Sequence, residues 1–108
     1  MIQDVHSAKT SIAVTAAPGT NIIIAGAADS WIYVHELMGD MSAAGTLIVK
    51  SGTNTLARFT LDQGQGLTES DEPGNDNVAR FKCPPGQDFV LVVTVGTFEG
   101  TVDYSRRY

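Results

Sequence analysis

The sequence has almost no helix signal. Nowhere do apolar residues recur at three- and four-residue spacing over the length that a helix needs. Cysteine is scarce as well, since Cys83 is the single one in 108 residues. An intrachain disulfide is therefore impossible, and the composition differs from that of a small secreted disulfide scaffold.

Basic residues are few. Seven Lys and Arg stand against twelve Asp and Glu, the net charge is -5, and only Arg106 and Arg107 are adjacent. Because binding to phosphates needs clustered cations, we expect no nucleic-acid partner. The longest apolar stretches, such as Phe89 to Val93, are too short to cross a membrane, and Met1 to His6 lack the basic and apolar regions of a signal peptide. We expect no membrane partner and synthesis in a host cytoplasm.

Short β-rich runs, separated by Gly, Asn, Asp, Ser and Pro, fill most of the chain. About eight runs follow one another at a spacing of roughly 8–12 residues, which is typical of a sandwich or barrel. They cover approximately residues 10–16, 21–25, 31–38, 46–50, 55–61, 78–82, 88–95 and 98–104. The sequence predicts an all-β fold, an antiparallel β-sandwich of jelly-roll type, as a single domain over residues 10–108. Residues 1–9, with Ile2 and Val5 isolated among polar neighbours, are predicted to form a flexible N-terminal arm.

Two runs carry more apolar residues than expected for strands of a sheet that has one face in the core and one face exposed to solvent. Phe89 to Val93 is apolar on both faces, and Trp31 to Met41 has the same excess. A sandwich of this size has no third layer, so we expect these surfaces to contact other subunits. Strict alternation along the second run puts two sets of side chains on opposite faces: Ile32, Val34 and Met38 with Glu36, against Trp31, Tyr33, His35 and Leu37. The candidate interface residues are Ile2, Val5, Trp31, Tyr33, Leu37, Met38, Met41 and Phe89.

The stretch from Asp62 to Asn77 is predicted to be a long irregular loop, because it contains four Gly and Pro residues and five acidic residues. Its part from Glu69 to Asp76 could bind a hard cation through carboxylates, but its spacing differs from that of a calcium-binding EF-hand loop. A solvated surface loop is the expectation, and no metal site is assigned.

Residues that carry chemistry are isolated from one another. His6 lies in the predicted arm, and His35 has a strand neighbour that points to the opposite face, so we expect it to be a packed or interface polar residue. Cys83 has no signature of a nucleophile and is expected to be a half-buried apolar residue at a strand end. Gly64 to Gly66 lacks the Lys and Ser or Thr of a phosphate loop. We expect no catalytic, cofactor-binding or metal-ligating residue, and a structural or binding module.

The order of several strands and turns resembles a known family. A strand such as Ile32 to Val34 is followed by Ser42 to Gly52, by a Leu-x-x-Gly-x-Gly corner at Leu61 to Gly66, and by a Pro-Gly-x-x-Phe segment with a hydrophobic strand at Pro85 to Val93. The last strand ends near Tyr104. In these features the chain resembles small β-sandwich virion structural proteins of tailed bacteriophages, of the capsid decoration or cement type.

This resemblance covers residues from Pro18 to Tyr104 and is a pattern of strands and turns, with no catalytic signature. It implies a homotrimer that binds the major capsid protein on the outside of the phage head and stabilises contacts between capsid subunits. The acidic segment Glu69 to Asp76 departs from the family, whose members are more apolar there. The alternative is a carbohydrate- or receptor-binding module of a phage fibre or tail, with Trp31, Tyr33 and Tyr104 as sugar-stacking platforms. A bacterial structural or lectin-like protein is a third possibility.

Overall fold

A computed structural model describes residues 9–71 and 79–108 of the chain. The described residues form nine strands and no helix, so none of them forms a helix that could cross a membrane. The strands are β1 (Thr10–Ala16), β2 (Gly19–Ile24), β3 (Trp31–Met41), β4 (Gly45–Ser51), β5 (Asn54–Leu61), β6 (Gly66–Ser70), β7 (Phe81–Cys83), β8 (Phe89–Val93) and β9 (Phe98–Arg107).

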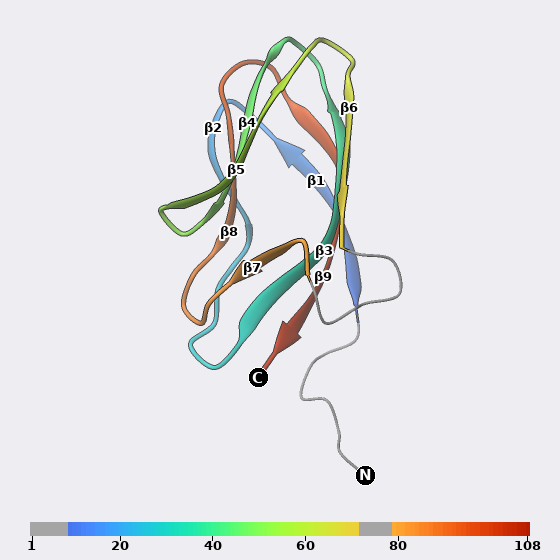
Figure 1. The fold of residues 1–108 in the computed structure, drawn as a ribbon. Helices are drawn as coiled ribbons and strands as arrows, with labels where there is room; N and C mark the ends of the chain where they lie inside the picture. The colour runs from blue at the N-terminus through green and yellow to red at the C-terminus, as the bar shows by residue number, and fades with distance from the viewer. Residues whose placement is uncertain (1–8, 72–78) are drawn as a thin grey trace.

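The strands form two packed sheets, which Figure 1 shows nearly edge-on. Sheet A has the order β1-β9-β3-β6, with the short β7 also paired to β3, and sheet B has the order β2-β8-β4-β5. All these strand pairs are antiparallel. Apart from β7, the pairs are nested along the chain: β4 with β5, β3 with β6, β2 with β8, and β1 with β9. This nesting is a jelly roll, and it confirms the predicted antiparallel β-sandwich.

One more strand is present than the sequence predicts. β6 lies inside the stretch that was expected to be an irregular loop. Leu67 is its only large apolar residue, so the segment carries too little alternation to be recognised as a strand. Its pairing with β3, for example of Thr68 with Met38, supplies the hydrogen bonds that its own sequence does not signal.

The core lies between the two sheets and is built from alternate residues of each strand. On β9, Phe98 and Val102 are fully buried and Tyr104 packs against the core, while Glu99 and Thr101 point outward. This alternation follows from the pleat of a strand, which turns successive side chains to opposite faces. Buried aliphatic and aromatic side chains of β4 and β8, in sheet B, fill the opposite side of the core.

A β-bulge at His35 breaks the alternation along β3. The pairing of β3 with β9 skips one residue between Val34 and Glu36. A bulge adds one residue to one strand, so the side chains that follow it change faces relative to strict alternation. Leu37 is therefore buried on the same face as Ile32 and Val34, and Met38 is 41% exposed. The predicted placement of these two residues is wrong, because strict alternation cannot anticipate the inserted residue.

Two glycines allow β3 and β9 to approach closely. Gly39 and Gly100 are partners in the register, and a Cβ on Gly100 would lie 1.8 Å from the carbonyl oxygen of Met38. A Cβ on Gly39 would lie 2.7 Å from the ring of Phe98 beneath it. Any side chain at either position would push the two strands apart.

Candidate functional site

The outer face of sheet A carries two pairs of carboxylates. Asp40 is the register partner of Glu99, and Glu36 is the register partner of Asp103. Asp40 and Glu99 are exposed, and the other two side chains are half-buried. Like charges directly opposite each other on one face of a sheet are destabilising. These four side chains are called the acidic face below.

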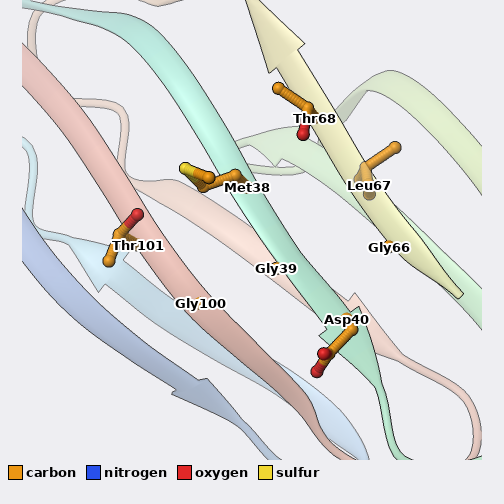
Figure 2. Close-up of a pocket in the computed structure, with 8 residues that line it drawn as sticks. All are labelled: Met38, Gly39, Asp40, Gly66, Leu67, Thr68, Gly100 and Thr101. Carbon is orange, nitrogen blue, oxygen red and sulfur yellow. The ribbon is translucent and has the colours of Figure 1, made fainter. Parts of the chain in front are cut away.

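A hollow lies within the acidic face, between the two carboxylate pairs and over β3, β6 and β9. Its volume is about 380 Å³, and Gly39, Gly66 and Gly100 are among the residues that line it. Figure 2 shows the side chains of Met38 and Thr101 around these glycines. Gly66 is the register partner of the exposed Asp40, so the missing side chain of Gly66 leaves room at the outer surface. Gly39 and Gly100 contribute only backbone to the hollow, because a Cβ on Gly39 would point toward Phe98 in the core.

Aromatic and basic side chains gather at the other end of sheet A. The rings of Trp31 and Tyr33 are 6.3 Å apart and nearly perpendicular, at 87°. The Lys82 Nζ lies 5.2 Å from the centre of the Tyr33 ring, and the Arg107 guanidinium lies 4.8 Å from it. These are cation–π contacts from strands on both sides of β3. They occupy the Tyr33 ring and leave Trp31, 40% exposed, as the main aromatic surface here.

The outer face of sheet B is apolar at its centre. Val90 is the register partner of Ile22 on one side, and Val92 is the partner of Ile48 on the other strand. Ile22 is 62% exposed, and Val92 and Ile48 are half-buried. Val90 does not belong to the core cluster and is nevertheless buried, because neighbouring strands flank it. No strand of the described residues covers this face.

The charges on the outer face of sheet B are all positive. Lys50 is the register partner of Val90, and Arg58 is the partner of Ile48. The four strands of sheet B contain no Asp and no Glu. The apolar side chains and these two cations are called the basic apolar face below.

A chain of hydrogen bonds connects β3 and β9 with Asp71, the residue that follows β6. His35 Nδ1 lies 2.8 Å from an oxygen of the Asp71 carboxylate, and His35 Nε2 lies 2.8 Å from the Ser105 hydroxyl. The backbone N–H of Asp71 also donates to the His35 carbonyl at 2.8 Å. The bulge in β3 positions the imidazole, because the inserted residue has no register partner on β9.

This order of groups is the one that serine hydrolases use: hydroxyl, imidazole and carboxylate. Ser105 is only 1% exposed and His35 only 3% exposed, so no substrate reaches the hydroxyl in this conformation. The hollow in the acidic face is lined by none of the three residues. The network instead satisfies buried polar atoms and ties the end of β6 to β3 and β9. Of the two roles expected for His35, a packed or an interface polar residue, the structure shows the packed one.

The acidic segment that the sequence singled out lies only partly within the described residues. Glu69 belongs to β6, and its carboxylate accepts from the Arg80 Nε at 2.7 Å and contacts the Arg80 Nη2 at 2.5 Å. Asp71 pairs with His35. The expectation of a solvated loop is wrong for these two carboxylates, because each has a partner distant in sequence. Residues 72–76 lie outside the description, and the described residues contain no cluster of metal ligands.

Cys83 is the last residue of β7 and is fully buried, not half-buried as expected. Burial raises the pKa of its thiol above the ordinary value, and the charge of Asp88 adds to this effect, while the nearby Ser51 side chain opposes it. The thiol is therefore poorly suited to act as a nucleophile.

The structure separates the predicted interface residues into three groups. Trp31 and Met38 are exposed, and Tyr33 is half-buried on the same face. Leu37, Met41 and Phe89 are at most 1% exposed and belong to the core, so the prediction that they contact another subunit is wrong. Their apolar character is explained by the space between the two sheets. Ile2 and Val5 lie outside the described residues.

Sequence reasoning missed both charged faces and the hydrogen-bonded triad. Lys50, Arg58, Asp40 and Glu99 are ordinary surface residues in the sequence, and only the strand order brings each pair together. An available signal was the absence of acidic residues from the segments that form β2, β4, β5 and β8.

The fold is therefore that of an antiparallel jelly roll whose two outer faces differ in charge. No family model matches the chain, and no curated protein is similar enough to count as a relative. Among solved structures, the chain is similar to a protein of Bacillus endospore appendages, described as a novel family of disulfide-linked pili. The TM-score is 0.51 and the sequence identity is 19%, over 98% of this chain and 89% of that chain. At this identity the similarity shows a shared fold.

Proposed function

We propose that this protein is a non-enzymatic structural subunit that decorates the outside of a bacteriophage head, as a homotrimer bound at junctions between major capsid proteins. The observation that carries the proposal is the outer face of sheet B, where Ile22, Ile48 and Val92 form an apolar surface that no described strand covers. Contiguous apolar surface of this kind is typical of sites that bind another protein. That other protein is a second copy of this chain within the trimer. The resemblance of the strand and turn order to decoration proteins names the major capsid protein as the partner of the assembled trimer.

The fold similarity supports a structural role on an external surface. The solved neighbour with the same arrangement of strands belongs to appendages of Bacillus endospores. Its description includes disulfide links, and these do not transfer to this chain. The 108 residues contain one cysteine, which can join two copies at most and is buried in β7. Non-covalent contacts must therefore hold any larger assembly of these 108 residues.

A decoration protein stabilises the shell through thermodynamic linkage between binding and assembly. A protein that binds only the assembled shell stabilises the shell by its binding free energy. Three copies joined in one trimer bind together, so weak individual contacts give strong total binding. DNA packed inside the head pushes the capsid subunits apart, and a clamp across their boundary resists this force.

Binding to emptied heads of the source phage tests the proposal. The purified protein is expected to bind at hundreds of copies per head and to raise the temperature at which the heads break. Ile48→Asp, which puts a charge into the apolar face, is expected to separate the copies of the trimer and so to abolish tight binding to the heads. Ala28→Asp, at an exposed turn position outside both outer faces, is expected to leave binding intact. No saturable binding of the unaltered protein to the heads would refute the decoration role.

A subunit of a filamentous surface appendage is a second candidate, and the fold similarity favours it. Electron microscopy of the purified protein separates the two. Filaments that form without any capsid protein would identify an appendage subunit, and discrete small oligomers that bind heads would identify a decoration protein.

The geometry disfavours the carbohydrate-binding alternative. Tyr104 packs against the core and points inward, away from Trp31 and Tyr33. The rings of Trp31 and Tyr33 are nearly perpendicular, so both cannot lie flat beneath one sugar ring. Three aromatic residues that the sequence groups together therefore do not form one stacking platform.

A further inference from the structure

The acidic face of sheet A holds four carboxylates that have no ion-pair partner within residues 9–71 and 79–108. Asp40 lies opposite Glu99, and Glu36 lies opposite Asp103. Each pair continues across the sheet into neighbouring residues of β1 and β6. Among the described residues, no cation forms an ion pair with any of these four carboxylates. Such like-charged pairs lower the stability of the isolated sheet. A positively charged partner on this face would convert that repulsion into attraction.

The opposite surface of the same molecule has the chemistry that would fit. The basic apolar face carries Lys50 and Arg58 and no carboxylate. No described residue forms an ion pair with Lys50 or Arg58. The charges of each face thus lack ion-pair partners within the described part of the molecule, and the two faces are opposite in charge.

The apolar parts of the two faces also correspond. Ile22, on the edge strand β2, is 62% exposed, and Ile48, on β4, is half-buried on the same face. The acidic face has the exposed Met38 beside the hollow of about 380 Å³ with its glycine floor (Figure 2). Two sheets that pack face to face lie about 10 Å apart with interdigitating side chains, which a protruding row and a hollow allow.

We propose that copies of this chain stack on one another, with the basic apolar face of one copy seated on the acidic face of the next. The inference rests on the proposed structural role and specifies the contact between subunits. This contact is heterologous, since it joins two different surfaces. Such contacts form a closed ring, for example a trimer, when the rotation between copies closes, and an open filament when it does not. A symmetric contact between two basic apolar faces is disfavoured, because it would bring Lys50 and Arg58 toward their own copies.

A pair of charge-reversal variants tests the stacking. Lys50→Glu with Arg58→Glu makes both faces acidic, and Asp40→Lys with Glu99→Lys makes both faces basic. Each variant alone is expected to weaken self-association, measured by sedimentation velocity, by about tenfold or more. An equimolar mixture is expected to restore assembly, because each face then meets a face of opposite charge. Asp29→Lys with Asp62→Lys, at exposed positions outside both faces, is the control for net charge and is expected to assemble normally.

Several results would overturn the stacking. They are a monomeric unaltered protein at every concentration, unaltered assembly of either variant, or a mixture that stays dissociated. Circular dichroism checks that each variant is folded, and Arg58→Glu alone, at an exposed position, replaces the double variant if that one fails to fold. Phage heads that still bind a dissociated Lys50→Glu, Arg58→Glu variant would overturn the stacking and leave the decoration role standing. Normal self-association without binding to heads would overturn the decoration role and leave the stacking standing.

Discussion

Asp40 and Glu99 stand directly opposite each other on the outer surface of β3 and β9, with no cation paired to either among the described residues. The next outward pair along these strands is Met38 with Thr101, and the pair after it, Glu36 with Asp103, repeats the arrangement. The protein therefore retains electrostatic repulsion at two neighbouring places of one surface, where a single uncharged residue in each pair would remove it. Surfaces that bind a partner of opposite charge have this property, because the same charges that cost stability in the free subunit favour association.

Replacing Asp40 with Asn should stabilise the dilute, unassembled subunit. The change removes one of two like charges, so the free energy of unfolding at low salt is expected to rise by about 0.2–1 kcal/mol. Urea unfolding measures the change, and the gain should shrink as salt screens the repulsion. Asp29→Asn, at an exposed turn position outside the acidic face, is the matched control and should have little effect. A loss of stability in Asp40→Asn would show that Asp40 makes a favourable contact instead.

The bulge at His35 predicts opposite effects for two adjacent residues. Leu37 is fully buried and Met38 is 41% exposed. Leu37→Ala is expected to cost about 2–5 kcal/mol of unfolding free energy, as buried leucines do. Met38→Ala is expected to change it by no more than about 0.5 kcal/mol, as exposed positions do. Strict alternation from Ile32 predicts the reverse order, so a larger loss for Met38→Ala would rule out the bulge.

The buried triad should contribute to stability and not to catalysis. Ser105→Ala leaves the Nε2 of a buried imidazole without its partner, which costs about 1–3 kcal/mol. Asp71→Asn should act through the same network, and the loss in the double variant should therefore be smaller than the sum of the single losses. A fluorophosphonate probe should leave the folded protein unmodified. An adduct on Ser105 would show an accessible, activated nucleophile and contradict the non-enzymatic role.

The thiol of Cys83 should be unreactive in the folded protein. Its pKa is raised, mainly by burial, so the neutral form is favoured and the thiol is shielded from reagents. The folded chain thus holds the proton at a pH where the unfolded chain releases it. Stability is therefore expected to fall as pH rises above the ordinary thiol pKa, and Cys83→Ala should flatten this alkaline slope. Titration with a thiol reagent, with and without denaturant, measures the protection; equal rates in both conditions would contradict it.

The local pattern of the sequence determined the fold class and most strand positions. Turn residues separate runs of β-branched and aromatic residues, and each run is short enough to be one strand. Apolar and polar residues alternate in the sequence from Phe98 to Tyr104, and burial along β9 follows this alternation, because the extra residue of the bulge lies on β3 and not on β9. Burial of every second residue is a local consequence of the pleat, so it is visible in the sequence.

Only the tertiary structure decided the features that depend on which strands are neighbours. β6 is a strand because β3 offers it hydrogen-bond partners, and His35 forms a bulge because β3 pairs with one residue fewer on β9. Leu37, Met41 and Phe89 were surplus apolar residues in the sequence and are core residues in the fold. The opposed carboxylates and the triad of His35, Asp71 and Ser105 join residues distant along the chain. Contacts of this kind follow from the nested order of the strands, which the pattern within any single strand does not encode.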